Sequence, residues 1–163
     1  MGKIGIAFLF VLTVAFLAPA QDYDGPIPDK ADIPFLLHAH NLIETEAGEA
    51  RMEERKNETA NILDGASSPV RTPLAEPIFI YKSGEIPVNK LSLWKVETVK
   101  GTREIAFPKD QRKARRNGPF PVHTIVRKVG EDVYWIEANE YLENGQYCLS
   151  PDGSQKVFCF EIY

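Results

Sequence analysis

Short apolar runs divided by turn residues fill the chain from Ile78 onward, and this spacing constrains the fold more than any other feature. Several runs alternate apolar and polar side chains, as where Trp94 and Val96 oppose Lys95 and Glu97, which is the period of a half-buried strand. The runs are 78–82, 91–98, 102–107, 122–129, 133–138, 146–150 and 156–163. They predict an all-β fold, a single antiparallel β-sandwich of about seven to eight strands.

The half of the chain before residue 78 gives weaker signals. Residues 35–42 resemble a first strand, whereas 44–58 are dominated by charge and predict at most one short polar helix or a surface loop. Residues 60–77 contain too many glycines, prolines and serines for long regular structure. In contrast, 77–81 are continuously apolar, which predicts a central strand covered on both faces.

Residues 1–20 have the three parts of a secretory signal peptide. Lys3 supplies the positive start, 4–17 form the apolar core, and Ala18 and Ala20 give the small residues that signal peptidase accepts. The alternative is an uncleaved membrane anchor, but the apolar run is shorter than the roughly 20 residues that a spanning helix needs. We therefore expect cleavage after Ala20, secretion or export to a periplasm, and no membrane span afterwards.

The 143 residues after the predicted cleavage site are enough for one domain. Gln21 follows that site where a bacterial lipoprotein would need cysteine, and the acidic segment 21–32 has too few apolar groups to order itself, so we expect a mobile leader before a β-sandwich domain at 33–163. All 23 acidic residues but only 18 of the 19 basic residues lie after residue 20, giving a formal net charge of −5. This charge argues against a surface that binds nucleic acid as a whole.

The sequence Leu142-Glu143-Asn144-Gly145-Gln146-Tyr147 resembles the tyrosine corner of immunoglobulin-like and fibronectin-type sandwiches. In that corner a leucine, a turn glycine and a tyrosine introduce a late strand, and the tyrosine hydroxyl bonds to the backbone a few residues upstream. The resemblance implies structural roles for Leu142, Gly145 and Tyr147. It implies an architecture and no function.

The two cysteines of the chain face each other if residues 148–159 form a hairpin. In an exported protein such a pair predicts a disulfide between Cys148 and Cys159, with a stapling role. A redox-active pair and two free thiols are the alternatives. A redox role is not favoured because the spacing is unlike the Cys-x-x-Cys motif at a helix start.

Two histidines in one predicted strand give the best case for a metal site. His38, His40 and Glu44 resemble part of the first metal-binding motif of cupins, and a second-motif histidine would have to be His123. The resemblance implies a metal-binding enzyme, although the glycines of both motifs are missing. The alternative is that these histidines lie on a half-exposed strand without a ligand.

Five basic residues are concentrated in one segment bounded by proline and glycine: Lys109, Arg112, Lys113, Arg115 and Arg116. Such a loop could bind phosphate, sulfate or carboxylate groups of an envelope polymer, and the alternative is a solvated loop that keeps strand edges apart. Aromatic residues do not alternate with the basic ones, so the segment does not indicate binding of single-stranded nucleic acid.

Together these features predict an exported, non-enzymatic structural or interaction module that uses no cofactor and binds an unknown protein or an envelope polymer. The first alternative is a cupin-like metal enzyme, and the second is recognition of anionic polymers by the 109–116 loop. The sequence contains no Gly-x-Ser-x-Gly motif, no phosphate-binding glycine loop and no dinucleotide fingerprint.

Overall fold

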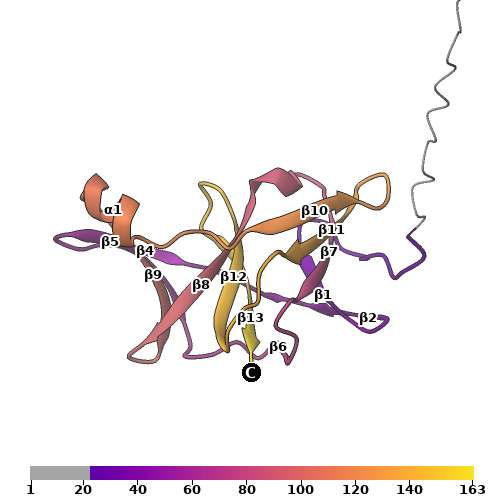
Figure 1. Cartoon of the computed structure of the whole chain (residues 1–163), viewed down its shortest axis with the longest axis horizontal. Helices are drawn as coiled ribbons and strands as arrows, with labels where there is room; N and C mark the ends of the chain where they lie inside the picture. Colours follow the sequence, from indigo (N-terminus) through magenta and orange to yellow (C-terminus); the bar gives the residue numbers. More distant parts are fainter. Residues whose placement is uncertain (1–22) are drawn as a thin grey trace, which may run out of the picture.

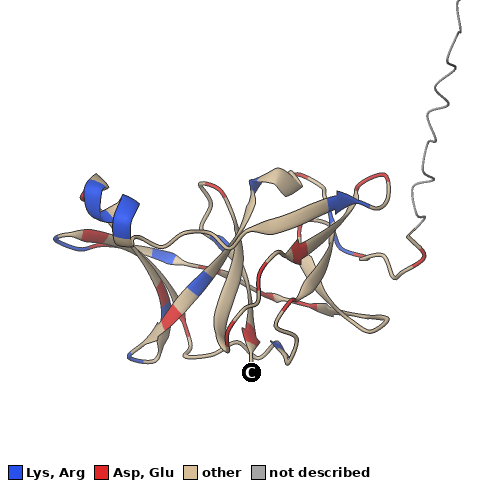
Figure 2. Ribbon diagram, in the orientation of Figure 1, with Lys and Arg blue, Asp and Glu red and all other residues tan. Residues whose placement is uncertain are grey.

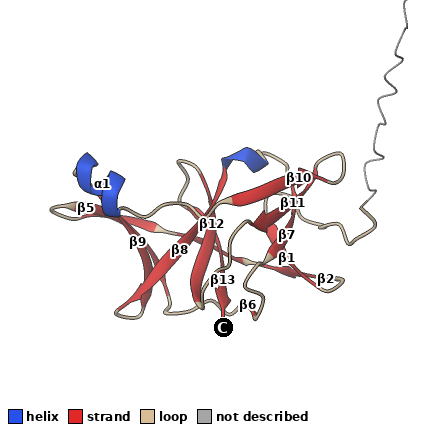
Figure 3. Ribbon diagram, in the orientation of Figure 1, coloured by secondary structure: helices blue, strands red, loops and turns tan. Residues whose placement is uncertain are grey.

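The apolar runs of the sequence become strands in the computed structural model, which describes residues 23–163 (Figures 1 and 3). The predicted signal peptide lies outside the described residues. The strands are β1 Pro34–His38, β2 Asn41–Glu44, β3 Glu46–Glu49, β4 Arg51–Glu54, β5 Glu58–Asp64, β6 Arg71–Thr72, β7 Ile78–Lys82, β8 Leu91–Val99, β9 Thr102–Pro108, β10 Thr124–Lys128, β11 Val133–Ala138, β12 Gly145–Pro151 and β13 Lys156–Ile162. A 3-10 turn, η1 Val88–Lys90, and one α-helix, α1 Gln111–Asn117, complete these elements. The predicted all-β class is confirmed.

One layer is a five-stranded antiparallel sheet with the order β10-β11-β7-β1-β2. Its middle strand, β7, pairs with β11 on one side and β1 on the other. Phe79, Ile80 and Tyr81 of β7 are all fully buried, so both faces of this strand are covered. This confirms the prediction of a central strand at 77–81.

The other sheet closes on itself. Its strand order is β3-β13-β12-β8-β9-β5-β4, and its two end strands, β3 and β4, are consecutive in the chain with only Ala50 between them. β3 pairs with β13, and β4 pairs with β5. The path of paired strands therefore returns to the segment where it began, and we call this closed sheet the strand ring.

The strands β12 and β13 belong to the ring and lie between its other strands and the five-stranded sheet, so they contact both layers (Figure 1). One face of this hairpin enters the main core with Phe79 of β7, where the Phe79 and Phe160 ring centroids are 5.0 Å apart. The opposite face carries Cys148 and Cys159 toward the inside of the ring. Because both faces are covered, nearly every residue from Gln146 to Pro151 is buried.

The residues that resemble a tyrosine corner lie at the start of this hairpin. The Tyr147 hydroxyl donates to the Glu143 carbonyl, four residues upstream, at 2.9 Å, and Leu142 is buried beside it in the core. Gly145 has φ +156°, close to the end of the range that other residues rarely adopt. The two antiparallel layers are compatible with the predicted β-sandwich.

The segment before residue 78 is more regular than the sequence indicated. The expected single strand at 35–42 is two strands with a turn at Ala39, where φ is +55°. The charged stretch 44–58, expected to be a helix or loop, contains β3, which pairs with β13, and β4, which pairs with β5. Arg55 pairs with Glu53, Glu58 and Glu104 and so offsets acidic charge beside β4. β5 begins in the same region and extends into the stretch expected to be irregular.

Residues 23–32, which belong to the segment expected to be a mobile leader, make specific contacts with the five-stranded sheet and the turn after β7. The Tyr23 ring packs edge-on against Trp135 of β11, with 6.2 Å between ring centroids. At the other end, the Asp32 carboxylate accepts bonds from the backbone N–H groups of Gly84, Glu85 and Ile86. These polar bonds hold Asp32 against the turn after β7.

Candidate functional site

The strand ring encloses a cavity of about 270 Å³ that opens to solvent. Every strand of the ring except β3 contributes to its wall. The wall contains Met52 from β4, Asn61 and Leu63 from β5, Trp94 and Val96 from β8, Ile105 and Phe107 from β9, Cys148 and Ser150 from β12, and Val157 from β13. The loop at 152–155, between β12 and β13, completes it.

The strand period explains why these residues meet. Side chains two apart in a strand share one face, so Trp94 points into the ring together with Val96, and Ile105 together with Phe107. The ladder places Asn61 directly opposite Ile105 on the neighbouring strand, which brings the polar amide into an apolar wall. The cavity is thus a direct product of alternation in strands that bend around one axis.

Two aromatic residues form one end of the cavity. The Trp94 and Phe107 rings meet edge to face, with centroids 5.5 Å apart and an interplanar angle of 84°. Met52 lies at the edge of the cavity and is 57% exposed. This end therefore offers large apolar surfaces that a ligand from solvent can reach.

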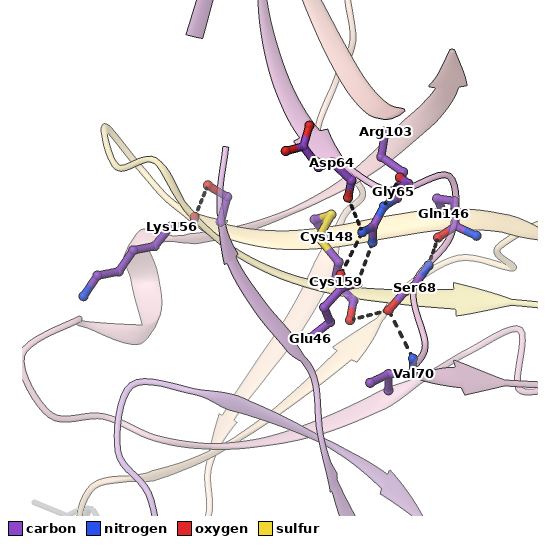
Figure 4. The surroundings of a disulfide bond; sticks show 11 residues. Glu46, Asp64, Gly65, Ser68, Val70, Arg103, Gln146, Cys148, Lys156 and Cys159 are labelled. Carbon is purple, nitrogen blue, oxygen red and sulfur yellow. Dashed lines mark hydrogen bonds and ion pairs between the residues drawn. A yellow bond between two sulfur atoms is a disulfide. The ribbon is translucent and has the colours of Figure 1, made fainter. Parts of the chain in front are cut away.

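A buried ion pair forms the opposite end. Arg103 lies four residues before Phe107 in β9, about 13 Å along the strand, and its side chain is only 2% exposed. Its guanidinium donates two bonds to the Glu46 carboxylate, at 2.6 and 2.8 Å, and further bonds to the carbonyls of Gly65 and Asp64 (Figure 4). The guanidinium is thus held by a bidentate partner and two carbonyls.

The ion pair keeps Glu46 charged. Burial by itself would raise the pKa of the Glu46 carboxyl, but the hydrogen bonds from Arg103 hold this pKa below its ordinary value. At neutral pH Glu46 is therefore a carboxylate bound to the Arg103 guanidinium. Its charge is balanced within the protein, so this end of the cavity does not need a charged ligand.

The disulfide predicted from the sequence is present and forms part of the cavity wall (Figure 4). Cys148 and Cys159 are directly opposed in the β12–β13 ladder, as expected. Close by, the Ser68 hydroxyl donates to the Cys159 carbonyl at 3.3 Å, and the Ser68 N–H donates to the Gln146 side chain at 2.9 Å. These bonds tie the segment before β6 to the hairpin that carries the disulfide.

The Oδ1 atom of Asn61 is buried and has no hydrogen-bond partner among residues 23–163. The opposite residues on the two flanking strands are Met52 and Ile105, neither of which offers a polar group. Buried side-chain oxygens normally have a partner, since an unpaired one loses its bonds to water. The Asn61 Oδ1 is thus a buried acceptor without a hydrogen bond among the described residues.

The residues proposed for a metal site do not come together. β1 ends at His38, and His40 lies in the following turn, so the two imidazoles do not share a strand face as predicted. Glu44 lies at the far end of β2 and pairs with Lys30. His123 precedes β10, three strand spacings or about 14 Å from β1 across the sheet. Among residues 23–163 no three His, Cys, Asp or Glu side chains are placed to hold a metal ion.

The basic segment forms a helix and not the predicted loop. The Asp110 carboxylate accepts from the N–H groups of Arg112 and Lys113 and caps α1, and the residues that follow favour helix. Lys109 is separated from this group because its ammonium pairs with Glu54 at 2.7 Å. The other four basic side chains are exposed on α1 and form no salt bridge with any described residue: Arg112, Lys113, Arg115 and Arg116 (Figure 2).

The chain matches no protein-family model, no curated protein and no solved structure. The candidate sites therefore rest on the geometry of this molecule alone. Within residues 23–163 the structure has no helix with the length and apolar character needed to cross a membrane.

Sequence reasoning missed the cavity and Asn61. A signal was available in the alternation of β8 and β9, which aligns Trp94 with Val96 and Ile105 with Phe107. However, alternation does not show whether the apolar face of a strand meets a core or a cavity. That distinction depends on the closure of the ring, which involves segments more than 100 residues apart.

Proposed function

We propose that the protein is an exported, non-enzymatic binding module whose ligand occupies the cavity of the strand ring. The observation that carries this proposal is the cavity of about 270 Å³ with its mostly apolar wall and a few polar residues. A concave, mostly apolar site with few polar groups is typical of small-molecule binding. The tyrosine corner supports a relation to immunoglobulin-like sandwiches, which host many different functions.

The ionisable groups around the cavity favour binding over catalysis. Arg103 and Asp152 are the two ionisable side chains among its described lining residues. Arg103 is held by Glu46, and the Asp152 carboxylate accepts a bond from the Ser92 hydroxyl at 3.2 Å. The described lining contains no histidine and no acid besides Asp152, so Asp152 and the Ser92 hydroxyl lack the further general base or acid that proton transfer to a bound substrate would need.

Blocking the edge of the cavity tests this function. We expect wild-type protein to bind 4-ethylphenol with a Kd below about 1 mM in isothermal titration calorimetry, and Met52→Trp to abolish that binding. Glu97→Trp is the matched control, because it places the same side chain at an exposed position of β8, outside the cavity lining. If wild-type and Met52→Trp proteins give the same heats, the cavity is not the binding site.

The proposed export has its own test. If residues 1–20 act as a signal peptide, the protein recovered from the medium or periplasm of an expressing cell begins at Gln21. N-terminal sequencing of the recovered protein measures this directly. Retention of the full chain in the cytoplasm would contradict the proposal.

A second candidate function is recognition of anionic polymers by α1. Four exposed basic side chains lie within one seven-residue helix, although the chain after residue 20 has a net charge of −5. Uncompensated positive charge of this kind attracts phosphate, sulfate or carboxylate groups. The loop proposed from the sequence is thus replaced by a short helix with the same chemistry.

Salt dependence distinguishes this second function from nonspecific association. Binding to immobilised dextran sulfate should weaken steeply as salt rises, and changing Arg112, Lys113, Arg115 and Arg116 to Gln should abolish it. A control variant loses the same charge through Gln at Lys90, Lys100, Lys128 and Lys156, all exposed and outside α1. Equal loss of binding in both variants would show a net-charge effect and remove α1 as a site.

A further inference from the structure

We propose that the strand ring selects a cationic amphiphile, an apolar molecule with one ammonium group, and that Asp152 at the opening of the cavity holds this group. The inference rests on the proposed function of the cavity and specifies the chemistry of its ligand. Three observations support it: the mostly apolar wall, the neutralised charge of Arg103, and the exposed Asp152 carboxylate.

The volume and the wall of the cavity determine the apolar part of the ligand. A protein cavity of about 150 Å³ holds a benzene molecule, and this one measures about 270 Å³. It therefore accommodates one substituted aromatic ring. Trp94 and Phe107, together with the aliphatic side chains of the wall, supply the apolar surface against which such a ring packs.

The polar part of the wall is concentrated in one short stretch of chain. Two of the six polar lining residues, Asn61 and Arg103, come from β5 and β9, and the other four lie within 150–155: Ser150, Asp152, Ser154 and Gln155. Asp152 and Gln155 line the cavity and are also exposed to solvent, so this stretch lies at its opening. A ligand that fills the cavity therefore has its polar end here, where it stays in contact with water.

Asp152 is the lining residue whose charge stays available to a ligand. Arg103 is the other charged residue of the described lining, and the Glu46 carboxylate neutralises it. The Asp152 carboxylate accepts a bond from the neutral Ser92 hydroxyl at 3.2 Å and forms no salt bridge with any residue from 23 to 163. The opening therefore carries one uncompensated negative charge.

Two lysines near Asp152 do not direct their ammonium groups into the cavity. In β13, Val157 lines the cavity and Phe158 lies in the main core, so alternation places Lys156 on the face of Phe158, away from the ring. Figure 4 shows the Lys156 side chain extending away from the disulfide. Lys90 contacts Asp152 through its backbone carbonyl, which accepts the Asp152 N–H at 2.8 Å, and is not part of the described lining.

The Asp152 charge confers selectivity by sign. Hydroxyl and amide groups both donate and accept, so the other polar residues of the stretch bond to ligands of either charge. A carboxylate accepts only, attracts a cation and repels an anion. An ammonium deep in the ring would lose its water without gaining a partner, which is strongly unfavourable. The ligand therefore binds with its apolar body inside the ring and its ammonium at Asp152.

The test compares two ligands that have the same apolar body and opposite charges. The affinities of 4-ethylbenzylamine and 4-ethylbenzoate are measured at pH 7 by isothermal titration calorimetry for wild-type protein and for Asp152→Asn, which keeps an acceptor for Ser92. The ratio of amine to benzoate affinity in wild type, divided by the same ratio in the variant, cancels the intrinsic difference between the ligands. We expect a quotient of about tenfold at low salt, because attraction and repulsion add, and a smaller quotient at high salt.

Two controls locate the effect at the cavity. Asp132→Asn removes the same charge from an exposed position in the turn between β10 and β11, outside the cavity lining, and should keep the wild-type ratio. An equal change in both variants would show an effect of net charge and contradict the inference. Met52→Trp should abolish binding of the amine, and unchanged binding in this variant would place the amine outside the ring, which also contradicts the inference.

A second neutral variant separates the lost charge from a change in folding. Asparagine and serine both suit a turn, so Asp152→Asn and Asp152→Ser should both keep the wild-type thermal transition in circular dichroism. Both should also give the same quotient. A quotient that differs between them would show that the shape of the side chain, and not its charge, selects the ligand.

The outcomes separate this inference from the proposed function. If 4-ethylphenol binds and the amine does not, or if the quotient is near one, the cavity binds apolar molecules without selecting a cation, and the inference is wrong. If none of the three ligands binds, both the inference and the proposed function of the cavity are wrong. A preference for the amine that Asp152→Asn removes and Asp132→Asn keeps supports both.

Discussion

The Asp32 carboxylate connects the N-terminal segment to Tyr81 and the turn after β7 by four hydrogen bonds. Its carboxylate accepts from the N–H groups of Gly84, Glu85 and Ile86 and from the Tyr81 hydroxyl. Burial alone would raise the pKa of Asp32, but the backbone bonds and the Tyr81 bond bring the net pKa below its ordinary value. Burial and the Asp32 charge in turn raise the pKa of Tyr81.

The lowered pKa of Asp32 makes its contribution to stability dependent on pH. A carboxyl whose folded pKa is depressed stabilises the fold above its unfolded pKa of about 3.9 and loses that contribution as pH falls through the folded value. We expect Asp32→Asn to lower the free energy of unfolding by about 1–3 kcal/mol at pH 7, and the difference from wild type to shrink below pH 4. Asparagine tolerates the φ of +62° at this position, so the backbone is not strained.

Urea unfolding at pH 7 and at pH 3 measures this effect. Asp29→Asn is the matched control, because it removes an exposed carboxylate from the same segment. If Asp32→Asn and Asp29→Asn have equal stability at pH 7, the Asp32 bonds do not stabilise the fold.

The disulfide also stabilises the fold, because it restricts the conformations of the unfolded chain. It links two strands across a sequence separation of 11 residues, for which the chain-entropy model gives about 3 kcal/mol. Replacing both Cys148 and Cys159 by Ala should therefore lower the free energy of unfolding by about 3 kcal/mol, as measured in urea.

Reduction provides the control for this prediction. Dithiothreitol should destabilise wild-type protein by a similar amount and leave the double variant unchanged. A loss below about 0.5 kcal/mol in the double variant would show that the bridge is not a structural staple.

Among the elements, β13 occupies the most connected position. It pairs with β12, β3 and β6, and its Phe160 and Ile162 side chains are buried in the main core. Deletion of residues 160–163 removes both side chains, and a single buried Phe→Ala change already costs about 3–5 kcal/mol. We expect the truncated protein to lack a cooperative thermal transition in circular dichroism.

Deletion of Tyr163 alone is the control for this truncation. Its ring is 53% exposed and contacts the Arg71 guanidinium, 4.3 Å from the ring centroid. Such an exposed contact contributes about 1 kcal/mol or less, so this variant should retain its transition. A cooperative transition in the longer truncation would mean that β13 is not essential to the fold.

The strands from residue 78 onward could be predicted from sequence, and the first strand in part, whereas β3, β4 and β5 could not. Turn residues and alternation fix runs such as 133–138, whose predicted and observed bounds are the same. β3 and β4 lack this signal, because β4 is exposed along its whole length and carries charge at three of its four positions. Its strand structure depends on pairing with β5 and on the salt bridges of Arg55, which no local pattern reveals.

The candidate sites also divide into those that the local sequence shows and those that depend on pairing between distant segments. The disulfide was predictable because two cysteines in one hairpin have few alternative arrangements, and the basic cluster was visible as composition. The cavity depends on the register of six strands and on the single residue Ala50 between β3 and β4. The proposed metal residues do not come together because His38 ends β1, whereas His123 lies before β10, and β7 and β11 separate β1 from β10 in the sheet.

At the scale of the whole molecule, β12 and β13 make the two layers dependent on each other. One face of the hairpin completes the main core and the other carries the disulfide into the strand ring. Unfolding either layer alone would expose an apolar face of the hairpin to water. Such exposure costs roughly 25 cal/mol of free energy for each Å² of apolar surface. The molecule should therefore unfold in one step.

The two tryptophans allow this cooperativity to be measured, because Trp94 lines the cavity of the ring and Trp135 lies in β11 of the five-stranded sheet. Trp135→Phe leaves fluorescence from the ring alone, and Trp94→Phe leaves fluorescence from the sheet alone. In each variant the urea midpoint from fluorescence should coincide with the midpoint from far-UV circular dichroism, because the shared hairpin couples the layers. A fluorescence midpoint that precedes the circular dichroism midpoint in one variant would identify the layer that opens first, and would show that the β12–β13 hairpin retains its structure without that layer.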